Sequence, residues 1–570
     1  MIKKVIVTII IILNSVFLYG QNDRKINFIG GARSLLNANT ITVSDSLPDT
    51  VSVKKNNGGY AIMDMGLLIK PNKNTEIMGM FRIRNEFGGF WGSGVSFDVR
   101  QLWLKGVVGN ALRYQLGDIN LKQTPFTLYN HHADQIDSLP EIFDLQRNIV
   151  SYDRFYTKNN SWRMQGANVD FGLNFSKIIQ EINFSGLITR LNATNFSNIP
   201  DRLMAGGSVN LVQSKSFEIG YNVNSVFDVK GTILDSNIFK NTVSTFDWKI
   251  KKEISGNLIS IGGEAGTSKH YFSADTLAPN LSDYFVNAFA KYYITKWRLT
   301  FTAGYLNVGP DFRSIGAQSK DVNYNGLPTF FNRYTNAQDI RPITLFDVIG
   351  NENIYNRTVT QNMMPISTVF NNVLPFGIAT NNRIGGYARV QFKTKNEIAL
   401  NAEYFNLNEI RGQGSFALKK FEVYKAYVLV PINKLIKHSK HISIQFGTTI
   451  QNTKRNSSES IENIKLESMQ INGGFRWEIF KNFDLLGGYI SQNTKGNEFS
   501  ADRNTYNQIT YFNIANYNLN QQIIAGGIRY NFGVNTHLTI LYQSNKYQDK
   551  LGNNASFEIK QFGIIYSITL

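Results

Sequence analysis

The stretch WRLTFTAGYLNV, residues 297–308, alternates apolar and polar side chains over most of its length. The apolar set is Trp297, Leu299, Phe301, Ala303 and Tyr305, and the polar set is Arg298, Thr300, Thr302 and Gly304. Successive side chains of a strand point to opposite faces, so the pattern predicts a strand with one apolar face. Eight residue steps of about 3.3 Å, tilted by about 40°, cover roughly 20 Å, close to the ~25 Å apolar band of a membrane-spanning strand. The stretch therefore predicts both a strand and a membrane location.

The same alternation recurs along the chain, in strands of about ten to thirteen residues. It is clear over 168–175, 398–404 and 537–543. The polar face includes charged residues such as Asp170 and Glu403. Charges of this kind are costly in a dry core, but they face water inside a wide barrel. We therefore expect an all-β fold whose inner face is polar and whose outer face is apolar.

Short connections between strands alternate with longer polar loops, a pattern typical of an up-and-down antiparallel transmembrane barrel with short periplasmic turns and long extracellular loops. The short connections are 71–74, 108–110, 176–181, 214–215, 254–256, 295–296, 394–396, 432–438, 478–481 and 533–535. With a first strand near 25–36 and a last near 556–570, the pattern predicts about 22 strands, within a range of roughly 18–24.

The first twenty residues predict a secretory signal peptide. Lys3 and Lys4 precede an apolar run over 5–18, and Gly20 precedes polar residues. The run is short for a membrane helix and contains Asn14, which favours a cleaved signal over an uncleaved anchor. We expect residues 1–20 to be the signal and 21–570 to form a single barrel domain that begins directly, with no preceding plug domain.

Composition narrows the classes of function. The chain of 570 residues has no cysteine and a formal net charge of +17. The absence of cysteine excludes disulfides and cysteine chemistry. No basic block with interleaved aromatic residues points to nucleic acid, so the expected anionic neighbours are outer-membrane lipopolysaccharide, anionic solutes or an acidic partner.

A Gly-Gly pair followed by an arginine recurs in three places. It occurs in IGGYARVQF (384–392), INGGFRW (471–477) and IAGGIRYNF (524–532). One interpretation is that the glycines permit barrel curvature and close side-chain contacts. A sharper one places Arg389, Arg476 and Arg529 in a basic ring inside the lumen, which Glu403 and Glu478 could neutralise. For the glycines we favour the first interpretation. Whether the three arginines form a ring is left undecided at this point.

The last strand is apolar at alternate positions up to the end of the chain. These positions are Phe562, Ile564, Tyr566, Ile568 and Leu570. This resembles the C-terminal signal of Gram-negative outer-membrane β-barrels, which usually ends in Phe where this chain has Leu570. The mature chain is similar to that superfamily over its whole length, as a porin-like channel without a plug domain. The resemblance implies insertion by the barrel-assembly machinery into the cell outer membrane.

Two loops are unusually long, about 120–162 and 309–382. Long loops in a compact protein are usually functional or disordered. The second contains an aromatic and basic cluster, which we take as a candidate constriction or partner-binding loop: Phe330, Phe331, Arg333 and Tyr334. Its apolar content predicts that it folds, either inward as a constriction or outward as a cap, and inward is favoured. The candidate lumen residues that would set ionic preference are Asp170, Arg298, Arg389, Glu403, Arg476 and Arg529.

Signals for metal, cofactor or catalysis are weak. His131 and His132 precede Asp134 and Asp137, but adjacent histidines alone are a poor metal signal and a polar loop is favoured. No G-x-S-x-G elbow or zinc-protease helix occurs in the sequence. We expect neither an enzyme nor a cofactor.

Three functions fit these observations. The first is an outer-membrane channel for polar solutes or an oligomeric substrate, narrowed by an in-folded loop. The second is a non-transporting barrel subunit that scaffolds an outer-membrane complex for secretion, assembly or surface attachment, with protein partners on its loops. The third is a soluble secreted all-β adhesin. The polar lumen favours the channel.

Overall fold

The computed structural model describes residues 25–43, 53–87, 95–109, 111–131, 139–143, 160–197, 200–233, 238–273, 276, 280–318, 372–503, 509–552 and 556–569. The expected signal peptide and the cluster over 330–334 lie outside these residues.

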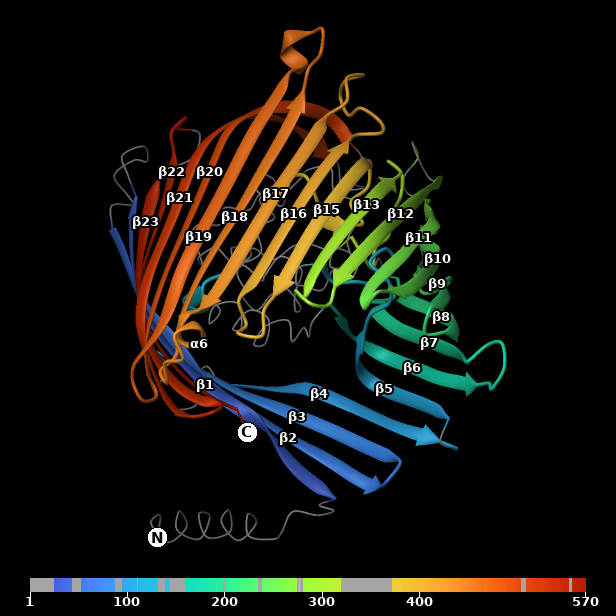
Figure 1. Ribbon diagram of the computed structural model, residues 1–570, viewed down its shortest axis with the longest axis horizontal. Coiled ribbons are helices and arrows are strands. Elements are labelled where there is room, and N and C mark those ends of the chain that lie inside the picture. The colour runs from blue at the N-terminus through green and yellow to red at the C-terminus, as the bar shows by residue number, and fades with distance from the viewer. Residues whose placement is uncertain are drawn as a thin grey trace.

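Within the described residues, 22 strands form one closed antiparallel sheet in which each strand pairs with its neighbours along the chain. Closure comes from β1 (Ile26–Val43) and β23 (Phe557–Thr569), which pair from Gly31 opposite Thr569 to Val43 opposite Phe557. The predicted fold class and strand number are therefore confirmed (Figure 1).

The wall between these two strands consists of twenty more. They are β2 (Val53–Asn72), β3 (Thr75–Glu86), β4 (Val95–Val108), β5 (Leu112–Leu121), β6 (Trp162–Asn174), β7 (Glu181–Asn192), β8 (Arg202–Ser214), β9 (Phe217–Asp228), β10 (Phe239–Ile254), β11 (Asn257–Phe272), β12 (Asn280–Ile294), β13 (Leu299–Val308), β15 (Arg383–Lys393), β16 (Ala399–Asn408), β17 (Lys420–Pro431), β18 (Ile442–Arg455), β19 (Ile464–Phe480), β20 (Phe483–Arg503), β21 (Ile509–Gly533) and β22 (Thr536–Asp549). The short strand β14 (Pro375–Ile378) is not part of the wall, so β13 pairs with β15.

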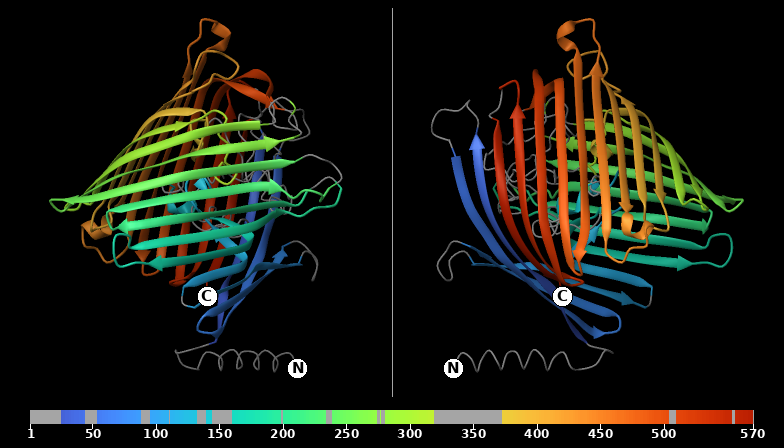
Figure 2. Two further views of the ribbon diagram at one scale, coloured as in Figure 1. Left: turned by 90° about the vertical axis from the view of Figure 1, so that its right-hand side faces the viewer. Right: turned by 60° about the vertical axis from the view of Figure 1, so that its left-hand side comes forward.

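All ten predicted short turns join consecutive strands, and they lie at one end of the barrel, which we call the short-turn end. The helix α6 (Ile432–Leu435) lies there, between β17 and β18, whereas η4 (Ser460–Glu462) tips the β18–β19 hairpin at the opposite, long-loop end (Figure 2). Some strands exceed the predicted length, and β21 reaches 25 residues because its pairing with β20 continues beyond the apolar band.

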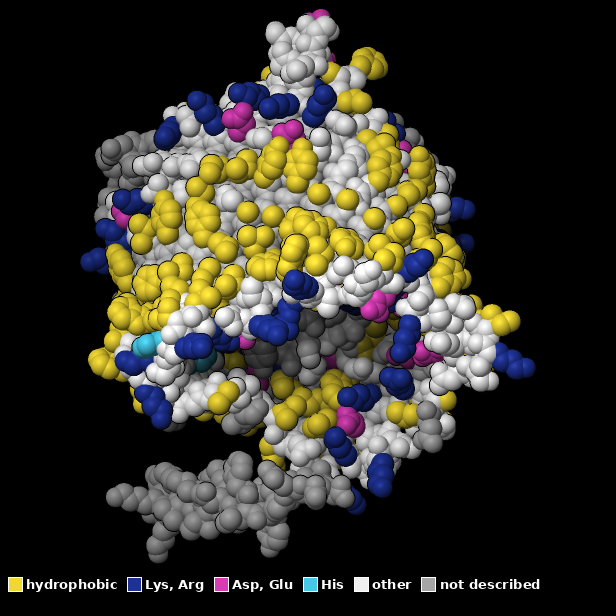
Figure 3. Space-filling view, viewed as in Figure 1, with side chains coloured by type: hydrophobic (Ala, Val, Ile, Leu, Met, Phe, Trp, Pro, Cys, Tyr) yellow, Lys and Arg dark blue, Asp and Glu magenta, His cyan; other side chains and the backbone are white. Residues whose placement is uncertain are grey.

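The outer face carries an apolar band. Phe301 on β13 points outward and is 43% exposed, whereas Leu306, of opposite parity, is fully buried on the inner face. Apolar side chains cover the middle of the wall, and Lys and Arg gather along its borders (Figure 3). A band of this kind matches the hydrocarbon layer of a membrane.

The inner face is less uniformly polar than the sequence predicts. Two buried apolar clusters line the wall from β5 to β17, and each includes residues from the long loops, such as Leu128 and Ile315 in one and Phe126 and Phe312 in the other. Inner positions near the long-loop end are therefore apolar where a loop covers them. Among the described residues, no helix is long and apolar enough to cross a membrane.

A charge on the outer face should cost more than the same charge one residue along. Phe301→Lys places an ammonium group in the apolar band, and we expect it to lower the free energy of unfolding by about 2–4 kcal/mol. The matched control Thr302→Lys points to the inner face and should cost much less. Urea unfolding in lipid vesicles, read from heat-modifiable gel mobility, measures both. Equal losses would contradict the assigned faces.

Candidate functional site

The loop between β5 and β6 enters the barrel, and its first part lies on the inner wall near the long-loop end. Phe126 stacks on Phe285 of β12 with ring centroids 3.9 Å apart. The side-chain amide of Gln123 donates to the carbonyl oxygen of Gly207 on β8, at 3.2 Å. Ser314, from the β13–β15 loop, donates to the Phe126 carbonyl oxygen at 2.6 Å. Packing and hydrogen bonds thus fix residues 122–131 to the strands from β8 to β12.

A second part of the same loop, residues 139–143, lies about half-way round the barrel, against β19 and β20. A Cβ added to Gly474 would be 2.4 Å from Pro140, and one added to Gly488 would be 2.6 Å from Ile142 and Phe143. These two positions must therefore stay bare for the segment to fit. The close-contact interpretation of the Gly-Gly pairs is confirmed here, and the loop reaches both walls of the interior.

Glu141 of this segment joins two of the predicted lumen arginines. Its Oε1 lies 2.5 Å from an Nη of Arg529 and 3.3 Å from an Nη of Arg476. Arg476 also pairs with the buried Asp484 of β20 at 2.9 Å. The pKa of nearby His441 is lowered mainly by burial and secondly by the positive charge of Arg476. The negative charge of Glu141 acts in the opposite direction. Two arginines and two carboxylates thus meet at the short-turn end of the inner wall.

The third predicted arginine lies apart from this junction. Arg389 on β15 pairs with Glu403 on β16, with Nε and Oε1 3.2 Å apart. Its guanidinium also lies over the rings of Tyr387 and Phe405, at 5.2 and 5.5 Å from their centroids. Arg389, Arg476 and Arg529 therefore do not form one joined ring. Each is matched by a carboxylate.

Sequence reasoning named one neutralising carboxylate correctly and missed two. Glu403 does pair with Arg389, but Glu478 accepts the backbone N–H groups of His441 and Asn482 at a turn. Asp484 and Glu141 take its place. Asp484 is opposite Arg529 in the β20–β21 register, so extending the strands from the turn would have revealed it. No local signal identified Glu141.

Of the two other predicted lumen residues, one lies in a strand as predicted and one does not. Asp170 lies in β6, where it accepts a hydrogen bond from Asn168 at 3.2 Å. The placement of Arg298 on the inner face of a strand is wrong. β13 begins at Leu299, and Arg298 is an exposed turn residue with a φ of 53°. The alternation misled because the apolar pattern begins at Trp297, inside the turn.

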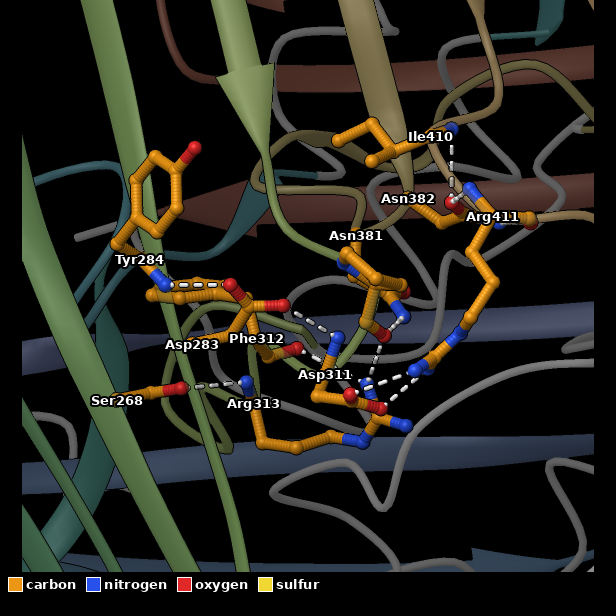
Figure 4. A network of polar contacts seen from close by, with 11 residues as sticks. Ser268, Asp283, Tyr284, Asp311, Phe312, Arg313, Asn381, Asn382, Ile410 and Arg411 are labelled. Atoms are coloured by element: carbon orange, nitrogen blue, oxygen red, sulfur yellow. Dashed lines mark hydrogen bonds and ion pairs between the residues drawn. The ribbon is translucent and has the colours of Figure 1, made fainter.

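The two ends of the β13–β15 loop are clamped together at the long-loop end (Figure 4). Arg411 forms two hydrogen bonds with the carboxylate of Asp311, at 2.5 and 2.8 Å, and these raise the pKa of the guanidinium. The side-chain oxygen of Asn382 accepts the backbone N–H groups of Ile410 and Arg411. The backbone N–H of Arg313 donates to Ser268 of β11. The middle of this loop, with Phe330, Phe331, Arg333 and Tyr334, lies outside the described residues.

A buried ionic cluster lies beside this clamp. The ammonium group of Lys419 is 2.6 Å from Glu498 of β20, and both side chains are less than a tenth exposed. The guanidinium of Arg383 lies 3.7 Å from the ring centroid of Phe421. Burial raises the pKa of the Glu409 carboxyl, against the opposing effect of Lys419. Lys419 contacts both carboxylates, Glu498 through its ammonium group and Glu409 through its backbone N–H. Arg383 donates to the carbonyl oxygens of Asn372 and Val373, so the cluster serves as a structural anchor.

The histidine pair gives no metal centre within the described residues. The Nε2 of His131 lies 3.0 Å from the carbonyl oxygen of Pro125, and its ring tilts against Tyr129. His132, Asp134 and Asp137 lie outside the described part of the chain. In that part, no group of three or more His, Asp or Glu side chains is placed to hold a metal ion.

Comparison with known proteins adds little to the geometry. No protein-family model and no curated protein matches the sequence. Among solved structures, OccK11 (OpdR) of Pseudomonas aeruginosa is 8% identical, covers 97% of this chain and all of its own, and has a TM-score of 0.33. The outer-membrane channel DcaP of Acinetobacter baumannii is 10% identical over 97% of this chain and all of its own, with a TM-score of 0.29. The usher PapC translocation pore is 7% identical over 95% and 99%, with a TM-score of 0.36.

The closed sheet and its outer apolar band decide the assignment independently of these likenesses. The chain has the architecture of a closed antiparallel transmembrane β-barrel. Among its interior features, the Glu141 junction and the loop that carries it form the candidate functional site.

The position of this loop can be tested by a disulfide, since the natural chain has no cysteine. Because the added Cβ of Gly488 would touch Ile142, the pair I142C and G488C should oxidise to a cross-link. The control pair I142C and T302C joins the segment to the inner face of β13, on a different part of the wall, and should not. Gel mobility with and without reductant measures both. Cross-linking of the second pair alone would contradict the position.

Proposed function

We propose that the protein is an outer-membrane channel for polar solutes or an oligomeric substrate, with its short turns in the periplasm and its long loops outside. The observation that carries this proposal is the combination of an outer apolar band with ion pairs on the inner wall, such as Arg389 with Glu403. A lipid-exposed wall needs the first, and a water-filled passage accommodates the second. No catalytic role is part of the proposal.

We also propose that the β5–β6 loop narrows the passage. Its first segment contacts the wall at β8–β12 and its second contacts the wall at β19–β20. The same loop therefore lies against two opposite parts of the inner wall. A wall of 22 strands otherwise encloses a lumen wide enough for an aqueous channel or a plug. The sequence favoured the 309–382 loop for this role. The ends of that loop support the first by bonds such as Ser314 to Phe126.

A scaffold role remains the second candidate because of apolar residues at the tips of the long loops. Phe196, Phe416 and Ile461 are all strongly exposed, and Phe416 is fully so. Exposed apolar residues at loop tips are positions where a partner protein could bind. Pull-down from detergent-solubilised outer membrane distinguishes the two functions. A stoichiometric partner together with electrical silence would favour the scaffold.

The narrowing proposal predicts that displacing residues 139–143 widens the passage. Gly488→Val inserts a side chain where Ile142 and Phe143 lie, and the three atoms nearest to its Cβ all belong to these two side chains. We expect the single-channel conductance in planar bilayers to rise measurably above that of the unmodified protein.

The matched control is Gly447→Val on the inner face of β18. The three atoms nearest to a Cβ at Gly447 all belong to the Asn472 side chain and none to the loop, so this variant should conduct as the unmodified protein does. An unchanged conductance in Gly488→Val, with the barrel still heat-modifiable, would count against narrowing by this segment.

A further inference from the structure

Glu141 occupies the space between two arginines of the wall as a ligand would. Its single oxygen Oε1 contacts both guanidinium groups, at 2.5 Å for Arg529 and 3.3 Å for Arg476. The two arginines belong to different strands, β21 and β19, so the wall presents them independently of the loop. Paired guanidinium groups are the arrangement that proteins use to bind carboxylates.

The charges of the wall leave a place for one anion. Arg476 is already paired with Asp484, which is 1% exposed and is also held by the side-chain amide of Asn531 at 2.8 Å. Among the groups joined here by ion pairs, the two arginines and Asp484 carry a net charge of +1, and Glu141 brings this sum to zero. Arg33 and Glu478, one of each sign, also lie near enough to act on the adjacent histidines, and together they leave the sum unchanged. If the loop moves away, the wall is left with an uncompensated positive charge that attracts an anion.

The arginines also keep unused hydrogen-bonding capacity. The Nε atoms of Arg476 and Arg529 are buried and make no hydrogen bond to the described part of the chain. A guanidinium can bind a carboxylate through two parallel N–H groups, and Glu141 uses only one nitrogen of each. A freely diffusing carboxylate can adopt an orientation that the tethered Glu141 does not.

We propose that Arg476 and Arg529 form a binding site for a carboxylate group of a permeating solute, and that Glu141 occupies this site until the solute displaces it. That the bound solute passes through the barrel rests on the channel function proposed above. The carboxylate class follows from the occupant itself. Binding would exchange one carboxylate for another and release residues 139–143 from the wall.

Arg389 provides the contrasting case within the same barrel. Its partner Glu403 lies directly opposite it in the β15–β16 register, so the carboxylate is part of the wall and has no loop to leave with. The pair is complete within the wall. A solute carboxylate gains a site at Arg476 and Arg529, where the partner is loop-borne, and none at Arg389.

The test uses succinate as the probe and uncharged succinamide as its control, with the full-length barrel in detergent. Glu141→Gln removes the competing charge without altering the wall, and we expect calorimetric titration to show succinate binding at least about tenfold tighter than in the unmodified protein. The double variant Glu141→Gln, Arg529→Gln should lose this increase in succinate affinity, because it lacks one of the two guanidinium groups of the site. Among the described residues the only ion pair of Arg529 is with Glu141, so no other ion pair is broken. Succinamide should bind none of the variants.

Glu403→Gln is the matched variant, since it removes a carboxylate from an arginine elsewhere on the inner wall, and it should leave succinate affinity unchanged. Equal tightening in Glu403→Gln and Glu141→Gln would overturn the site, as would no tightening in Glu141→Gln. Conductance is measured separately in planar bilayers. Tighter binding with no conductance in any variant would reject the channel but keep the site, and conductance without the change in binding would do the reverse.

Discussion

The pairing of β1 with β23 is the constraint on which the rest of the structure depends. A strand exposed to lipid cannot satisfy its backbone N–H and C=O groups with water, so an open sheet edge inside a membrane costs several kcal/mol per unpaired group. The register from Gly31 to Val43 closes the sheet and removes both edges. No disulfide assists, because the chain has no cysteine. The outer apolar band and the enclosed interior are consequences of this closure.

Closure also creates an interior too wide for side chains of the wall to fill. The long loops respond by covering parts of the inner face with apolar contacts, as Phe126 does against Phe285. Where they do so, the inner wall is apolar, and elsewhere it carries paired charges such as Arg389 and Glu403. The inner face is therefore divided into anchoring surfaces and polar surfaces. Bare glycines such as Gly488 allow the backbone of the wall to receive the loop closely.

The sequence predicted the wall well and the interior poorly, for physical reasons. Strand alternation and turns are local, so the ten short turns and both terminal strands could be identified from neighbouring residues. The prediction for Arg298 was wrong because the apolar Trp297, in the turn, continues the alternation beyond the start of the strand. Loop destinations depend on contacts between distant residues. Glu141 and Arg529 are 388 positions apart, and no local pattern links them.

That separation has a consequence for how the molecule is made. The two partners stand in the first and last quarters of the chain, so their ion pair can form only when the β5–β6 loop and β21 are both in place. Contacts of such long range are the last to be rewarded as a chain folds. The Glu141–Arg529 pair therefore requires β21 in the wall but neither β22 nor β23, whereas closure of the sheet requires both of these strands. A chain that ends after β21 would separate the ion pair from the closure of the barrel.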